Sequence, residues 1–300
     1  MSKMPFLLLF VSLLATQTAF SQLFDGRTLS IAHINDLTAK VKPGTILLLG
    51  ENHGLQAHRD QHLAVLQALR AAGLRVSVGL EFVNYTDQRF LNDYRTGILN
   101  EDQFLTAIKW QGFKFDFYRD QLNFPIISNG EFSLGLNLPR SVTSQISKNG
   151  LAALSPDDLA LMPPNFSLGR DSYRRRFMEA AGAHCKVPEN CFMAQCAWDD
   201  TMAWQATNFI SQHPDQVLVV VVGEFHVQFG GGIKHRVLQR LPGADVVTLS
   251  QIWADGMTDE DVQQAMQVSP EEGPRADFIW VSRPVPGPVS SHAAATFGIN

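Results

Sequence analysis

The feature that most constrains the fold is a run of six apolar residues at Val217–Val222, five of them valine. A continuous β-branched run predicts a strand covered on both faces, as in a parallel sheet with helices on either side. Similar short runs predict strands at residues 46–49, 76–80, 125–128, 134–136, 246–249 and 278–281. Helical patterns lie at residues 56–72, 86–110, 141–148, 173–181 and 192–211. The alternation predicts a single α/β domain, a three-layer sandwich with a mostly parallel central sheet flanked by helices.

The two ends of the chain differ from the rest in composition. Lys3, a short apolar stretch and small residues up to Ser21 predict a secretory signal peptide over residues 1–21. The apolar stretch is shorter than the roughly 20 residues that span a bilayer. No cysteine follows it that could carry a lipid anchor. We therefore expect a periplasmic or secreted protein without a transmembrane segment, a domain over residues 22–283 and a disordered tail over residues 284–300.

Charge and cysteine content narrow the ligand classes. The net charge is −5 and no basic stripe stands out, which argues against a nucleic-acid partner. Cys185, Cys191 and Cys196 lie within twelve residues of one another. In an oxidising compartment, the favoured pairing is a disulfide between Cys185 and Cys191, with Cys196 left over and buried. A metal site made of all three cysteines is the alternative, although no histidine lies at zinc-finger spacing.

Polar residues that suggest chemistry follow directly after predicted strands. The order Gly-Glu-x-His occurs twice, at Gly50–His53 and Gly223–His226, and Glu81 follows a third strand. Ligands of open α/β sheets bind beyond the carboxyl ends of the strands, and glycine permits a sharp turn there. We expect these residues to converge in one site that holds a metal ion or works by acid–base catalysis. The side chains with that chemistry are Glu51, His53, Glu81, Glu224 and His226.

Four further polar residues lie on predicted helices. Asp199 belongs to an otherwise apolar stripe of the longest helix, so it requires a partner such as an arginine, a backbone cap or the main site. Asp200 points away from that stripe, and we expect it to be solvated. His58 and His62 lie four residues apart on the first helix, a spacing that suits metal ligation. Their polar neighbours favour a solvated helix face instead.

Five motifs resemble those of the ChaN-like haem-binding uptake proteins. In chain order they are Leu-Gly-Glu51-Asn-His53 with His58 and His62, Gly-Leu-Glu81-Phe with Asp87-Gln88, Leu-Asn137-Leu-Pro-Arg140 with Gly150-Leu-Ala-Ala, Ala194–Ala203, and Gly223-Glu-Phe-His226 with Gly230-Gly-Gly-Ile. The resemblance runs from about residue 38 to 250. The chain is more remotely similar to the TIKI metalloproteases and erythromycin esterases, which use the glycine–histidine elbows for hydrolysis.

The resemblance implies haem binding linked to iron acquisition, and a homodimer that holds two stacked haems. The chain departs from the family pattern in two respects. It lacks the lipoprotein cysteine that many members carry, and Glu224 stands where many relatives have a smaller or neutral residue. The extra carboxylate would strengthen a metal site and favours hydrolase-like chemistry.

Haem requires an axial base, an apolar slot and cations near its propionates. Tyr173 with Arg174 and Arg175, and His184 further on, are the candidate haem-binding residues. A surface helix with a basic face is the alternative interpretation. The chain has no Cys-x-x-Cys-His motif, so any haem would be bound non-covalently.

The sequence thus supports two functional hypotheses. The first is an exported haem-binding protein linked to haem or iron uptake. The second is a metal-dependent hydrolase with zinc, manganese or cobalt, in which the metal lowers the pKa of a bound water. Its metal ligands would be His53, Glu81, Asp199 and His226. A metal-free acid–base site is a variant of the second hypothesis.

Overall fold

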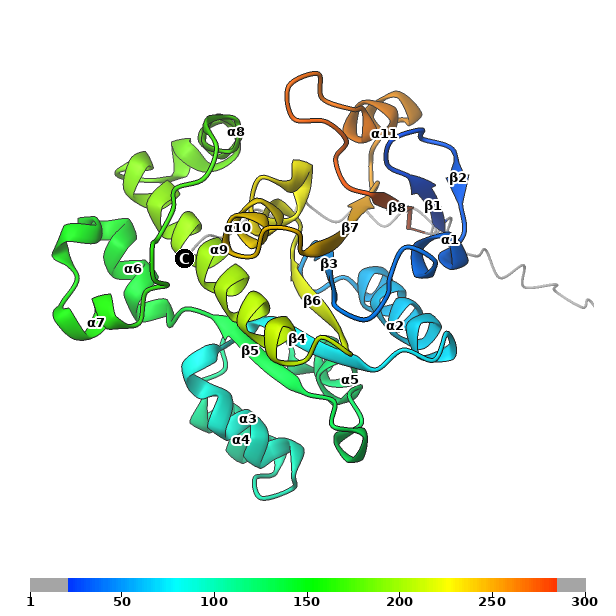
Figure 1. The fold of residues 1–300 in the computed structure, drawn as a ribbon. Helices are drawn as coiled ribbons and strands as arrows, with labels where there is room; N and C mark the ends of the chain where they lie inside the picture. The colour runs from blue at the N-terminus through cyan, green and yellow to red at the C-terminus, as the bar shows by residue number, and fades with distance from the viewer. Residues whose placement is uncertain (1–20, 285–300) are drawn as a thin grey trace, which may run out of the picture.

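The computed structural model describes residues 21–284, so the predicted signal peptide up to residue 20 and the tail from residue 285 lie outside the described residues. In this part of the chain, eight strands form one sheet in the order β2-β1-β8-β7-β3-β6-β4-β5 (Figure 1). The strands are β1 (Ser21–Asp25), β2 (Ile31–Ala32), β3 (Thr45–Glu51), β4 (Val76–Asn84), β5 (Ser133–Asn137), β6 (Val217–Gly223), β7 (Asp245–Trp253) and β8 (Phe278–Ser282). The six strands from β8 to β5 are parallel, and β1 and β2 add antiparallel pairs at one edge.

Helices cover both faces of the sheet (Figure 1). They are α1 (Ile34–Thr38), α2 (Gln56–Ala71), α3 (Gln88–Arg95), α4 (Glu101–Ala107), α5 (Arg119–Asn123), α6 (Arg140–Asn149), α7 (Pro156–Ala160), α8 (Asp171–Ala181), α9 (Pro188–Gln212), α10 (Ile233–Arg240) and α11 (Asp259–Met266). Leu47 and Leu49 of β3 pack in one core cluster with Leu66 of α2. Ile46 and Leu48, on the opposite face, pack in another cluster with α9 and α10. The predicted three-layer α/β sandwich is therefore confirmed.

Some predicted boundaries were wrong for local reasons. The run at residues 125–128 is not a strand but leads into a 3-10 turn at Ile127–Asn129, closed by Gly130 with φ 69°. Pro125 has no N–H to donate to a sheet ladder, which disfavours a strand at this position. The helix-rich stretch predicted at residues 86–110 is confirmed and contains two helices, α3 and α4, because Gly97 adopts φ 78° and Asn100 caps the second helix.

In the pairing of β3 with β6, equivalent residues of the two elbows are offset by one position. Glu51 pairs with Gly223, and Gly50 pairs with Val222. Side chains alternate between the faces of a sheet, so an offset of one residue reverses the face that equivalent residues occupy. The two copies of Gly-Glu-x-His therefore do not point their glutamates in the same direction.

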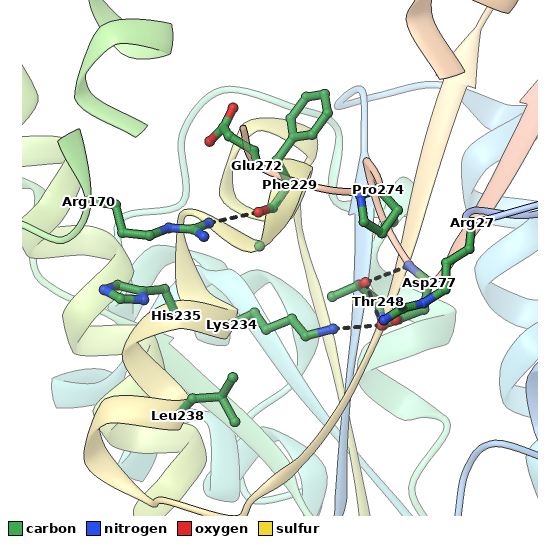
Figure 2. A pocket seen from close by; sticks show the side chains of 12 residues that line it. Arg27, Arg170, Phe229, Lys234, His235, Leu238, Thr248, Glu272, Pro274 and Asp277 are labelled. Carbon is green, nitrogen blue, oxygen red and sulfur yellow. Dashed lines mark hydrogen bonds and ion pairs between the residues drawn. The ribbon is translucent and has the colours of Figure 1, made fainter. Parts of the chain in front are cut away.

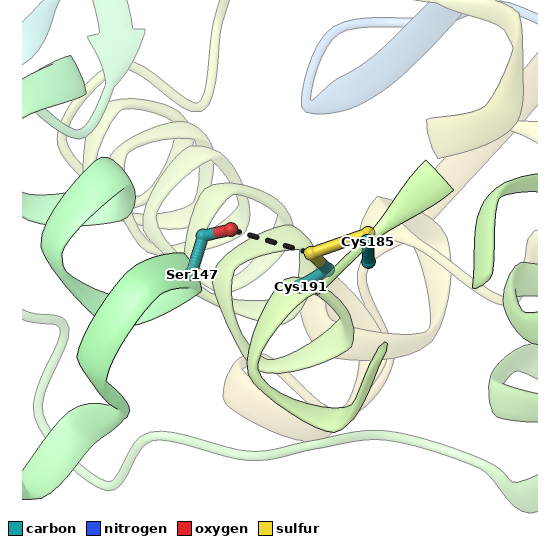
Figure 3. Close-up of a disulfide and its surroundings, with 3 residues drawn as sticks. All are labelled: Ser147, Cys185 and Cys191. Atoms are coloured by element: carbon teal, nitrogen blue, oxygen red, sulfur yellow. Dashed lines mark hydrogen bonds between the residues drawn. A yellow bond between two sulfur atoms is a disulfide. The ribbon is translucent and has the colours of Figure 1, made fainter. Parts of the chain in front are cut away.

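The disulfide prediction is confirmed. Cys185 and Cys191 are bonded, and Cys196 is free and buried. Figure 3 shows the bond beside α6, where the hydroxyl of Ser147 lies 3.3 Å from Sγ of Cys191. The alternative three-cysteine metal site is wrong, because two of its thiols are consumed. No helix within residues 21–284 is long and apolar enough to cross a bilayer.

Candidate functional site

The two elbow histidines lie together around the carboxylate of Glu81. Oε1 of Glu81 lies 3.5 Å from Nε2 of His226, and its Oε2 accepts the backbone N–H of Gly223 at 2.6 Å. A Cβ built on Gly223 would lie 2.9 Å from Nε2 of His53 and 3.5 Å from Oε2 of Glu81. The structure thus brings His53, Glu81 and His226 to one point at the carboxyl edge of the sheet.

Glycine is needed in the elbows for space rather than for an unusual turn. Neither Gly50 nor Gly223 has a positive φ. A Cβ on Gly223 would collide with the His53 ring, and a Cβ on Gly50 would overlap Oε2 of Glu224. The expectation that these glycines permit a sharp bend was therefore wrong, and close approach of side chains to the backbone is the reason for them.

The first elbow presents a partly exposed imidazole supported by a buried carboxylate. Nδ1 of His53 lies 3.0 Å from Oε1 of Glu51, which also accepts the hydroxyl of Tyr118 at 2.7 Å. The His53 side chain is 28% exposed, whereas that of Glu51 is 3% exposed. Burial acts to lower the pKa of His53, but Glu51 and Glu81 outweigh it, so the pKa is raised.

Aromatic rings flank the exposed imidazole. Phe82 contacts the His53 ring edge-on with centroids 4.9 Å apart, and Phe113 lies at 5.1 Å. Phe113 is itself 40% exposed. Trp110 packs edge-on against Phe82, with ring centroids 6.3 Å apart. The His53 ring therefore lies within an apolar aromatic patch.

The second elbow holds its imidazole between two carboxylates. Nδ1 of His226 lies 2.7 Å from Oδ1 of Asp199, while Nε2 faces Glu81. Burial acts to lower the pKa of His226, but Glu81 and Asp199 raise it to about 10. Burial also opposes ionisation of Glu81, yet His226 and His53 lower its pKa to about 2. At neutral pH the site therefore contains an imidazolium enclosed by carboxylates.

Asp199 is fully buried, as the apolar stripe of its helix predicted. Its second oxygen accepts the hydroxyl of Tyr173 at 2.6 Å, and the guanidinium of Arg236 lies 3.8 Å away. Gln195 adds a side-chain amide 3.1 Å from Nδ1 of His226. Asp199 thus lies directly behind the second elbow and orients its imidazole.

Glu224 does not join the other elbow residues. Its carboxylate accepts the guanidinium of Arg275 at 3.0 Å and the N–H of Gln251 at 3.1 Å, and it also contacts Ser250. It lies over Gly50, on the face opposite to Glu51. The sequence does not show the one-residue offset between the strands, and the prediction that placed Glu224 in the site was wrong for that reason.

Three residues that we expected on solvated surfaces are buried. His58 and His62 are fully buried, and Asp200 is 1% exposed and accepts Nε of Arg240 at 2.7 Å. Nδ1 of His62 lies 3.6 Å from Oε2 of Glu51, and Nδ1 of His58 accepts the backbone N–H of Asn52. The solvated-face interpretation was wrong because polar residues from distant strands meet this face of α2.

The predicted haem-binding residues occupy two environments. Tyr173 is fully buried, and its hydroxyl donates to Asp199. Arg174 and Arg175 are exposed, and each pairs with a surface glutamate. His184 is exposed and ends the short 3-10 turn before the disulfide. Tyr173 therefore supports the second elbow, while the other three lie on the surface.

The donor set gives no support to a divalent metal. Among residues 21–284, no group of three or more histidine, cysteine, aspartate or glutamate side chains could hold an ion. Both ring nitrogens of His226 face carboxylates, which raise its pKa.

Sequence reasoning missed several residues of the site. Tyr118 and Phe113 come from the segment between α4 and α5, and Gln195 comes from α9. The density of aromatic residues over residues 110–118 was the one signal that could have indicated a binding surface.

Comparison with known proteins gives the family. The family model described as haem-binding uptake, Tiki superfamily, ChaN matches residues 37–237. The chain belongs to this family. The solved structure of ChaN of Campylobacter jejuni, described as binding haem cofacially, is similar at 18% identity with a TM-score of 0.59. That match covers 87% of this chain and 96% of the other.

A second similar structure is an erythromycin esterase mutant in its open conformation, at 12% identity and a TM-score of 0.48. It covers 86% of this chain and 97% of the esterase. No curated protein matches the chain by sequence.

Proposed function

We propose that this chain is an exported protein that binds haem non-covalently and serves haem or iron uptake. Membership of the haem-binding uptake family supports the ligand class. The observation that carries the proposal is the His53 imidazole, 28% exposed and set against the exposed ring of Phe113. A haem site requires an axial base beside an apolar slot, and these two side chains supply both.

The residues around His53 fit this ligand. Among the described residues, Nε2 of His53 has no hydrogen-bond partner, while Glu51 engages Nδ1. A carboxylate on Nδ1 fixes the tautomer and increases the basicity of Nε2, as it does in metal-binding histidines generally. Phe82 and Phe113 would contact the face of a flat apolar ligand. When bound, haem would supply an iron centre, for which His53 is the proposed axial base.

The residues predicted earlier remain a second proposed haem surface. Ligation by Tyr173 would require its hydroxyl to leave Asp199 and would expose a fully buried ring. His184 is exposed and needs no such rearrangement. The burial of Tyr173 supports His53 or His184 over Tyr173 as the axial base.

Export and dimerisation belong to the same proposal. The disulfide between Cys185 and Cys191 supports an oxidising compartment such as the periplasm or the exterior. We propose a homodimer in the haem-bound state, to be measured by size-exclusion chromatography with and without hemin.

A hemin titration followed by absorbance tests the proposal. We expect the mature protein to develop a Soret band that saturates with hemin. His53→Ala should shift that band and weaken binding about tenfold or more, as loss of an axial ligand would. Tyr173→Phe and His184→Ala test the second surface in the same way. A change of the Soret band in one of them, and not in His53→Ala, would place the haem there. A wild-type protein that produces no saturable band would contradict the proposal.

The paired imidazoles and carboxylates favour a second candidate, a hydrolase that works by acid–base catalysis. Glu51 orients His53 so that Nε2 could accept a proton from an attacking water. His226, a cation at neutral pH, would then stabilise negative charge that develops on the substrate. Nothing in this arrangement requires a divalent ion.

Hydrolysis of p-nitrophenyl esters and of a peptide library, each with and without EDTA, tests this candidate. We expect turnover that EDTA leaves unchanged and that His53→Ala and Glu51→Gln abolish. Turnover lost with EDTA and restored by zinc, manganese or cobalt would instead support the metal-dependent version. No turnover on any substrate would leave haem binding as the function of the site.

A further inference from the structure

A small cavity lies beside the turn that follows the second elbow. It has a volume of about 220 Å³ and is lined by α10, by the segment before β8 and by the turn after β1. Figure 2 shows Arg170 and Lys234 on one side of the cavity, and Arg27 with Asp277 on the other. Sites for drug-sized ligands occupy about 300–1,000 Å³, so this cavity suits a smaller molecule.

Each of the two carboxylates that line the cavity is paired with a cation, although Oε1 of Glu272 is buried without a hydrogen-bond partner among the described residues. Asp277 accepts Nζ of Lys234 at 2.8 Å and the N–H of Thr248 at 2.9 Å. Glu272 pairs with Arg176 at 2.5 Å. Two lining guanidiniums, those of Arg27 and Arg170, have no carboxylate within 4.0 Å among the described residues. The lining therefore holds three cations, Arg27, Arg170 and Lys234, against the two carboxylates of Glu272 and Asp277.

Arg170 lines the cavity and is anchored to the turn after the second elbow. Its NH2 group donates to the carbonyl of Phe229 at 2.8 Å. Its Nε is buried, and it has no hydrogen-bond partner in the part of the chain that the structure describes. Because this Nε is closed to solvent, an anion in the cavity would meet the terminal N–H groups of the Arg170 guanidinium instead.

The turn that lines the cavity is strained and firmly held. Phe229 adopts φ 54°, a left-handed conformation that bulky residues rarely occupy. Its N–H donates to the carbonyl of Arg275 at 2.6 Å, and the guanidinium of Arg176 lies 4.8 Å from its ring. Strained backbone that several contacts fix in place is a feature of ligand sites.

The pKa of His235, which lines the cavity, responds to the charges around it. Burial lowers the pKa of this imidazole, and the neighbouring cations Arg170 and Arg236 lower it further. A bound anion would offset those cations and make protonation of His235 easier. The imidazole is thus a probe of occupancy.

We propose that this cavity binds a small oxyanion, a phosphate or a carboxylate, through Arg27, Arg170 and Lys234. Guanidinium groups present forked donors that match both oxyanions, and an ammonium group adds a point charge. Leu238 and Pro274 on the rim would contact an apolar part of the molecule that carries the anion. The proposed oxyanion site does not depend on haem binding by His53.

NMR titration of the histidine side chains of the full mature protein tests the proposal. One arm adds sodium phosphate, a second adds sodium succinate, and a third adds sodium chloride at equal ionic strength. We expect a saturable rise in the pKa of His235 with phosphate, succinate or both, and the stronger arm identifies the oxyanion. The His235 signal is assigned with His235→Gln.

Two variants and one control give the result its specificity. Arg27→Gln removes an exposed guanidinium with no carboxylate partner, so it should fold normally and weaken oxyanion binding severalfold. Arg170→Gln should weaken binding about tenfold, the loss expected of a charged hydrogen bond. Arg89→Gln, an exposed arginine on α3 that does not line the cavity, should bind as the wild type does. An equal response to chloride, or unchanged binding in both cavity variants, would overturn the proposal.

Discussion

The two elbows share the order Gly-Glu-x-His but present their histidines differently. His53 is 28% exposed and has one carboxylate at hydrogen-bond distance, whereas the side chain of His226 is 6% exposed and lies between Asp199 and Glu81. The glutamate of the first elbow supports its own histidine. The glutamate of the second elbow faces Arg275 instead. The same motif therefore contains an accessible imidazole at His53 and a buried imidazolium at His226.

The comparison shows that strand register decides which residues of a repeated motif are equivalent. Because Glu51 pairs with Gly223, the first glutamate and the second glycine share a face of the sheet. That glycine leaves the space that the His53 ring occupies. Carboxylates from β4 and α9 replace the missing glutamate at the second elbow.

The largest difference should be in stability. His226→Ala removes the imidazolium between the buried carboxylates of Asp199 and Glu81 and leaves Asp199 only the more distant Arg236, which should reduce the free energy of unfolding by about 3–5 kcal/mol. His53→Ala removes a partly exposed ring and should cost about 1 kcal/mol or less. Urea unfolding of both variants measures the comparison. Equal losses would mean that the elbows do not differ in burial and charge.

Glycine substitutions should separate the two elbows by ligand binding. Gly223→Ala pushes a methyl group into the His53 ring, so we expect hemin affinity to fall about tenfold through misplacement of the axial base. Gly50→Ala displaces Glu224 instead and should reduce stability while hemin affinity stays within about threefold. Gly182→Ala, where the added carbon meets only ordinary contacts, is the control. Similar hemin affinities for the Gly50 and Gly223 variants would count against the proposed axial base.

The pH dependence of stability should carry a separate signature from each elbow. The folded pKa of His226 is raised from 6.5 to about 10, so its contribution is full below pH 6.5 and is lost as the pH rises through 10. Burial lowers the pKa of His58, behind the first elbow, to about 3. The contribution of neutral His58 to the free energy of unfolding is full above pH 6.5 and is lost as the pH falls toward 3. Thermal unfolding across this range should show a maximum near pH 6.5, and His226→Gln should flatten only the alkaline side.

The smallest effects should come from Glu224. Glu224→Gln should leave the pKa of His53 within about 0.3 units, because the carboxylate lies on the other face and acts only at long range. Glu81→Gln should lower the pKa of His53 and His226 together, since Glu81 raises both. Histidine NMR titrations of the two glutamate variants measure the contrast. A large response to Glu224→Gln would place that residue in the site after all.

The fold was largely predictable because it depends on local patterns. Val217–Val222 and the apolar run before Gly50 predicted buried parallel strands, and both strands lie at the centre of the sheet. The histidines and Glu81 were predictable as strand-end residues for the same reason. Asp199 was identified because a carboxylate within an apolar stripe needs a partner.

The remainder depends on register and on contacts between distant segments. Nothing local to Glu224 indicates that its strand is offset by one residue from its neighbour. His58 appeared solvated because its neighbours in sequence are polar. Its backbone carbonyl nevertheless accepts the side chain of Gln251, which is 193 positions away. Tyr118 likewise reaches Glu51 from 67 positions away.

The two elbow histidines lie within electrostatic reach of each other, one accessible and one fixed as a cation. The pKa of His53, measured by NMR in the wild type and in His226→Gln, tests this directly. The charge of His226 lowers the pKa of His53, so its removal should raise that pKa measurably. An unchanged pKa of His53 would show that the two rings are too far apart to form one site.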